Sequence, residues 1–134
     1  MVERISIVVN KGLSAGQKAN VAAIIMGQLA LSNNQVYENE VMDIDNTIHV
    51  GIQVNVIILE STESQLISLI NDAKKSNLNY YVFTRIGQEL SNSFSVYKEK
   101  IYSMNTINTG VVGVGVFGCS DEIKNLTKKF RLSK

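Results

Sequence analysis

The chain of 134 residues contains no proline, no tryptophan and a single cysteine, Cys119. One cysteine excludes an internal disulfide and any metal site built from several thiolates. With no basic and then apolar leader at its start, the chain is expected in a reducing, cytoplasmic compartment. Long apolar runs are also missing, since the longest, 21–26, is far below the roughly 20 residues that cross a bilayer. We therefore expect no membrane partner.

An excess of charge of one sign is absent as well. The formal net charge is +1, with 45% hydrophobic and 19% charged residues, which is typical of a globular protein. This balance gives no general attraction for nucleic acid, so an RNA partner would need a local basic patch. We expect one domain over 1–134, because no linker, repeat or low-complexity tract divides the chain.

Hydrophobic patterning predicts strands that alternate with helices. The expected strands are 4–10, 48–59 with an irregularity near Gly51 before a central strand, 80–84 and 109–117, and the expected helices are 15–31, 63–75, 91–104 and a last one capped by Ser120. Ser14 is the expected N-cap of the first helix, and Thr62 with Gln65 forms a capping box before the second. A turn is expected around Asp43, Asp45 and Asn46. This order predicts a three-layer α/β/α sandwich with a short mixed, mainly parallel sheet.

The helix 15–31 carries apolar residues around most of its circumference. Such a helix is either sandwiched inside the fold or covered by a second subunit, which makes a homodimer one expectation. The run Gly113–Gly118 fits the pattern G-x-G-x-x-G, but it lies inside a late strand and not in a turn that opens a first βαβ unit. It predicts a flat strand face for close helix packing, or for a second copy, and no dinucleotide site.

Four polar residues are expected near the carboxyl ends of strands, where open α/β proteins place their sites. Lys18 lies in the first turn of a helix, where the dipole disfavours a cation, so its presence points to an anionic partner. Asn20 follows it, and Thr84 and Arg85 end a later strand. The four predict a site for a small anionic or nucleotide-like ligand. The alternatives are a solvated Lys18 beside a packed Asn20, and an Arg85 that pairs with Glu89.

Two residues are candidates for catalysis. His49 is the only histidine, a residue type suited to acid–base work near neutral pH, and Cys119 precedes a helix whose dipole would favour a thiolate. A structural role remains open for both. A lone histidine does not make a zinc site without several carboxylates, so we expect neither a metal nor a cofactor.

Three segments resemble a known family. These are Gly16–Ala23, then Asp45–Ile52 before the strand 54–59, and Gly113–Cys119 followed by Lys124–Leu132. They resemble a bacterial family of unknown function (domain of unknown function 2000) that is similar in fold to type-2 peptidyl-tRNA hydrolases. The resemblance implies that fold over the whole chain.

The hydrolases open their first helix with Gly-Lys-Ile-Ala-Ala-Gln and carry Asp-Ala-Gly-Arg-Thr after a later strand. Lys18 stands where the first motif has its lysine, Ala22 replaces the glutamine, and Thr84-Arg85 stands near the second motif without its aspartate. Three hypotheses therefore stay open: a ligand-binding domain, a divergent esterase that uses His49 or Cys119, and a non-catalytic homodimer.

Overall fold

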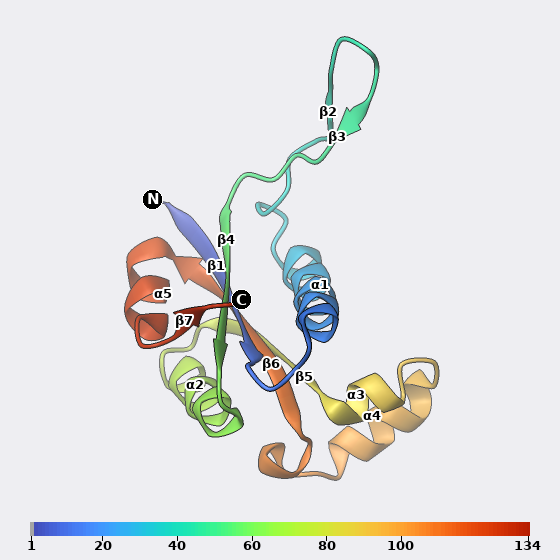
Figure 1. The fold of residues 1–134 in the computed structure, drawn as a ribbon, viewed down its shortest axis with the longest axis vertical. Coiled ribbons are helices and arrows are strands. Elements are labelled where there is room, and N and C mark those ends of the chain that lie inside the picture. The colour runs from blue at the N-terminus through green and yellow to red at the C-terminus, as the bar shows by residue number, and fades with distance from the viewer. Residues whose placement is uncertain (1) are drawn as a thin grey trace.

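A computed structural model describes residues 2–134 and shows a five-stranded sheet in the order β5-β6-β1-β4-β7 (Figure 1). The strands are β1 (Glu3–Asn10), β4 (Asn55–Ser61), β5 (Asn79–Thr84), β6 (Val111–Cys119) and β7 (Arg131–Leu132). Only β1 and β4 pair in parallel, and the other three pairs are antiparallel. The mixed sheet is confirmed, but the expectation of mainly parallel pairing is wrong, because β6 runs antiparallel between β1 and β5. The central strand is β1, and β4 lies second from the edge.

Helices cover both faces of this sheet, which confirms the three-layer sandwich. α1 (Ala15–Ser32) packs on one face, and α2 (Glu63–Lys75) and α5 (Ser120–Thr127) pack on the other. The central strand β1 contributes Ile5, Ile7 and Val9 to one hydrophobic core and Val8 to the other. Both expected capping boxes form, at Ser14 for α1 and at Thr62 for α2. In the last helix, however, Ser120 is the first helical residue, and Cys119 occupies the N-cap position without a capping hydrogen bond from its side chain.

The glycines of β6 bring α1 close to the sheet. A methyl group at Gly113 would lie 2.5 Å from Cγ1 of Val21, and one at Gly115 would lie 2.9 Å from Cδ1 of Leu29. This confirms the prediction of close helix packing on a flat strand face. Because α1 of the same chain already covers these glycines, they do not form a surface for a second copy.

A helical excursion joins β5 to β6. It contains α3 (Arg85–Glu89), α4 (Phe94–Tyr102) and the 3₁₀ turn η1 (Thr106–Asn108), in place of the single helix expected at 91–104. No residue of α4 is buried. β5 is an edge strand, and the excursion continues from its C-terminal end, where α3 contacts the strand.

Residues 37–52 form a separate hairpin, which we call the arm, and it projects from the body at the C-terminal end of α1 (Figure 1). It pairs β2 (Val41–Met42) with β3 (Ile48–His49) and turns at Asn46, whose φ is 64°. The expected turn is therefore confirmed, but the expected strand 48–59 is split between arm and sheet. At the base of the arm, the N–H of Glu38 donates to the carbonyl oxygen of Gly51 at 2.7 Å.

Within residues 2–134, no helix combines the length and the apolar character that a membrane span requires.

Candidate functional site

An apolar groove lies between α1 and the α3–α4 excursion, above β5. Its volume is about 380 Å³, within the range typical of small-molecule sites. No lysine, arginine, histidine, aspartate or glutamate lines it, and Gln28 and Ser91 supply polar groups. The lining residues are Ile24, Ile25, Gln28, Tyr81, Val82, Phe83, Gly87, Leu90, Ser91, Phe94 and Tyr97.

The walls of the groove follow from the local structure. Alternation along β5 turns Tyr81 and Phe83 toward α1, where both pack against the core on that side. Gly87 in α3 lies against Phe83, since a methyl group there would come within 2.6 Å of its Cε1 atom. Phe94 and Tyr97 on α4 form the opposite wall, with ring centroids 6.3 Å apart. The arrangement suits a small, flat and uncharged molecule, and its side chains offer little for acid–base chemistry.

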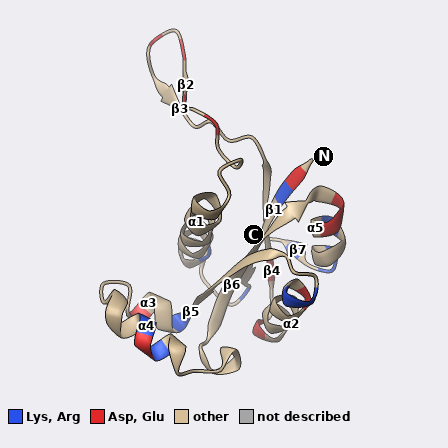
Figure 2. Cartoon of the chain, turned by 180° about the vertical axis from the view of Figure 1, so that it is seen from behind, with Lys and Arg blue, Asp and Glu red and all other residues tan. Residues whose placement is uncertain are grey.

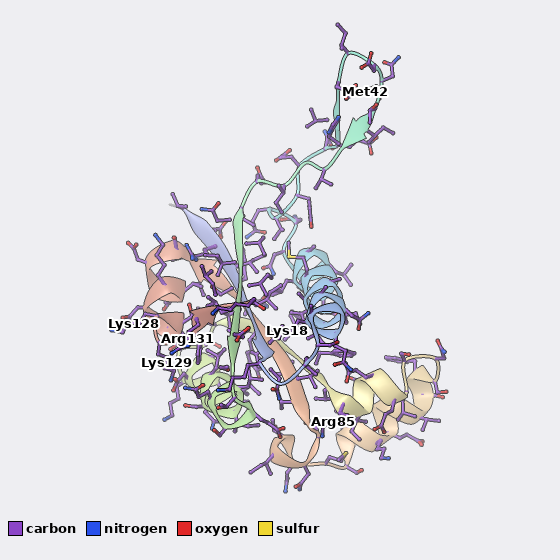
Figure 3. All side chains as sticks on the ribbon, in the orientation of Figure 1. Lys18, Met42, Arg85, Lys128, Lys129 and Arg131 are labelled. Atoms are coloured by element: carbon purple, nitrogen blue, oxygen red, sulfur yellow. The ribbon has the colours of Figure 1, made fainter. Side chains whose placement is uncertain are left out.

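Lys18 lies on the side of α1 that faces the sheet, outside this groove (Figure 3). Its Nζ atom lies 3.0 Å from Oε1 of Glu60 on β4, and the two side chains are only 12% and 17% exposed. The hydrogen bond from Lys18 holds the pKa of Glu60 below its ordinary value. The anionic partner that the position of Lys18 suggested is thus present inside the chain.

The other three residues expected at the sheet edge differ in their location, burial and hydrogen bonds. Asn20 is exposed on α1, and Thr84 is buried at the end of β5. The hydroxyl oxygen of Thr84 accepts a hydrogen bond from the N–H of Gly87 at 3.1 Å and so caps α3. Arg85 donates its backbone N–H to the carbonyl oxygen of Gly110 at 2.7 Å.

The structure brings Thr84 and Arg85 together but places Lys18 elsewhere. Thr84 and Arg85 are neighbours at the junction of β5 and α3, whereas Lys18 bonds to β4, and β6 and β1 lie between these two strands. Among residues 2–134, the guanidinium of Arg85 forms no ion pair with Glu89. The expected alternative pairing is therefore not formed.

The two candidates for catalysis lie on different elements. His49 is on the arm, where its Nε2 atom lies 2.6 Å from Oδ2 of Asp43. This hydrogen bond, with one from the N–H of Thr47, lowers the pKa of the Asp43 carboxyl. Cys119 ends β6 and lines a separate shallow hollow with Ser120. Neither residue lines the groove, so they do not form one reaction centre with it.

Metal ligands do not gather in the described part of the chain. No group of three or more histidine, cysteine, aspartate or glutamate side chains there could hold a metal ion.

Sequence reasoning missed the groove for an identifiable reason. The spacing of Phe94 and Tyr97 indicates one face of a helix, and the aromatic residues of β5 indicate a strand. Neither pattern reveals that α4 stands off from the sheet. The available signal was the number of large apolar residues that follow Thr84 in the sequence. In the structure Phe94, Val96 and Tyr102 among them are exposed.

Comparison with known proteins places the fold and the family. A structure of a protein of unknown function from Agrobacterium tumefaciens is similar to this chain with a TM-score of 0.87, at 12% sequence identity, over 100% of this chain and 99% of that one. At this identity the likeness shows the fold alone. No curated protein matches the sequence. The sequence model described as "Protein of unknown function (DUF2000)" matches residues 3–134, and the chain therefore belongs to this family.

Proposed function

We propose that this domain binds a small, uncharged and largely apolar molecule that contains a flat ring, in the groove between α1 and the α3–α4 excursion. The observation that carries the proposal is a groove of about 380 Å³ with four aromatic side chains and no charged side chain among its lining residues. Ligand sites are typically concave, mostly apolar and equipped with a few polar groups that fix orientation. Gln28 and Ser91 would supply such groups.

This ligand chemistry replaces the small anionic ligand expected from the sequence. The cation of Lys18 is neutralised by Glu60, and the hydroxyl of Thr84 is used to cap α3. An anion at the sheet edge would therefore rely on Arg85 and the exposed Asn20. An uncharged ring in the groove requires no such group, because burial of apolar surface and ring stacking supply the affinity.

A divergent esterase of the peptidyl-tRNA hydrolase kind is the alternative, and it rests on the sequence resemblance around Lys18 and Thr84-Arg85. Ester hydrolysis needs one group that activates water and another that stabilises the developing oxyanion. His49 on the arm is hydrogen-bonded to Asp43, and Lys18 is hydrogen-bonded to Glu60, so these contacts favour structural roles for both side chains.

A titration with indole, followed by amide chemical shifts in nuclear magnetic resonance spectra, tests the groove. We expect saturable shifts confined to amides that line it, such as those of Gly87 and Ser91. A Ser91→Phe variant should abolish them, because the new ring fills the groove. The matched control Ser95→Phe places the same ring on an exposed position of α4 outside the lining and should preserve binding. Equal binding by both variants, or shifts scattered over the whole surface, would overturn the proposal.

A further inference from the structure

The arm is unusual in what it exposes. Every residue from Tyr37 to Val50 is exposed, and Ile44 at its tip is 96% exposed. Val41, Met42, Ile48 and Val50 are each more than half exposed. An exposed apolar patch on a projecting element indicates an interaction surface. No described part of the body covers the arm, since the arm points away from the sheet and its helices (Figure 1).

The arm is also acidic. It carries four carboxylates, at Glu38, Glu40, Asp43 and Asp45, and no lysine or arginine (Figure 2). The Asp43 carboxylate is engaged by His49. Among residues 2–134, the side chains of Glu38, Glu40 and Asp45 form no ion pair. The surface that covers the arm should therefore be apolar in part and basic.

One edge of the body has those properties. β7 is the last strand of the sheet and pairs with β4 on one side only, so its other side is an open edge. Leu132 on β7 is 64% exposed. Lys128, Lys129 and Arg131 lie close together beside β7 (Figure 3), and all three are exposed and form no ion pair with any described residue. We call these four residues the basic edge.

We propose that the arm of one copy of this chain lies along the basic edge of a second copy, and the reverse, in a two-fold symmetric dimer. Acidic and apolar groups on the arm then meet basic and apolar groups on the edge, and the strands of the arm extend the sheet of the partner. The arm precedes the N-terminal end of β4 and projects away from the body, whereas β7 pairs with the C-terminal half of β4. The arm therefore does not reach the basic edge of its own chain, and the contact is intermolecular.

The size of the surface also fits a second copy. The arm and the basic edge together offer about 20 residues, at the lower end of the roughly 20–30 per partner found in stable interfaces. In a two-fold symmetric dimer, the arm and the basic edge of each chain both contact the partner, as an isologous interface requires. A monomeric partner would engage one of them and leave the other uncovered.

A charge swap tests this contact directly. Variant one carries Glu38→Lys, Glu40→Lys and Asp45→Lys on the arm, and variant two carries Lys128→Glu, Lys129→Glu and Arg131→Glu on the edge. Each variant alone brings like charges together twice in a homodimer, so we expect its dissociation constant to rise about tenfold or more. A mixture of the two should restore dimers, because in the mixed pair both arms face edges of opposite charge.

Sedimentation equilibrium of the full chain and of each variant provides the measurement, with circular dichroism to show that each is folded. A Gly27→Arg variant is the control, because a side chain at this exposed position of α1 meets open space and Gly27 belongs to neither the arm nor the basic edge. It should remain dimeric. A monomeric wild type, a dimer that only Gly27→Arg disrupts, or folded single variants whose mixture stays monomeric would each overturn the proposal. The groove proposal is unaffected by any of these results, because indole binding can be measured on a monomer.

Discussion

Replacing Gly113 by alanine tests whether the packing of α1 on β6 is as close as the structure indicates. The added methyl group would lie 2.5 Å from Cγ1 of Val21 and 2.9 Å from Cδ1 of Ile25. Both neighbours are buried, at 0% and 2% exposure, so neither side chain has free space to move into. The backbone itself does not oppose alanine, since Gly110 is the only described glycine with a positive φ. The effect should therefore come from packing.

The expected loss is about 2 kcal/mol of unfolding free energy. Adding a methylene-sized group to a filled core typically costs about 1–3 kcal/mol, and two contacts below 3.0 Å with buried side chains place Gly113 at the upper end of that range. Replacing glycine by alanine restricts the unfolded chain and returns roughly 0.4–1 kcal/mol of that. For a domain of this size, a net loss of this order corresponds to a fall of roughly 8 °C in Tm.

Urea and thermal unfolding of the variant measure this loss, and Gly118→Ala on the same strand is the matched control. At Gly118 the nearest atom, 3.2 Å away, is Cδ2 at the end of the half-buried Leu78 side chain. That side chain can give way, so the control should change stability by less than about 1 kcal/mol. Equal effects of the two substitutions would refute the reasoning, because close helix contact would then not be the cause.

Three further substitutions test local contacts. Lys18→Met should reduce the loss of stability on acidification, because Lys18 lowers the pKa of Glu60 from 4.5 and the pair therefore stabilises the fold above that pH. In the wild type this stabilisation is lost as the pH falls through the lowered pKa. Thermal unfolding from about pH 6 to about pH 3 measures the difference, and a parallel loss of stability in the two proteins would contradict the prediction. Thr84→Val should cost about 1 kcal/mol in urea unfolding by removing the cap of α3, while Thr84→Ser stays near wild type; equal losses would argue against the cap. Gly51→Ala should speed amide exchange in the arm without changing the Tm of the body, because its methyl group would strike the backbone of Asn39, and unchanged exchange would refute that contact.

Local features could be predicted from the sequence because their causes are local. The capping residues Ser14 and Thr62 satisfy helix N–H groups within three residues, so their spacing identifies the start of each helix. The two-sided apolar run 4–10 indicates a buried strand wherever that strand lies in the sheet. The glycines of β6 indicate close packing, although the partner helix is 90 residues away in the chain.

The sheet directions and the arm could not be predicted in the same way. An apolar run on both faces fits a central strand of either direction, so β6 is compatible with parallel and antiparallel pairing until its neighbours are known. Residues 48–52 alternate as a strand of the sheet would, and only the close approach at Gly51 shows that they belong to a hairpin that leaves the body. In both cases the deciding contact is distant in sequence.

Lys18 and the arm show how a nearly neutral chain can still be strongly patterned. The position of Lys18 in a first helical turn suggested an anionic ligand, but the carboxylate that Lys18 contacts belongs to Glu60 of the same chain. In contrast, the carboxylates of Glu38, Glu40 and Asp45 on the arm and the cations beside β7 form no ion pair among residues 2–134. A net charge of +1 conceals this separation, because the carboxylates of the arm and the cations beside β7 lie on different surfaces of a chain whose acidic and basic groups nearly balance in number. Such separation costs little in an exposed monomer, and it would become favourable in the proposed dimer, where opposite surfaces of two copies would meet.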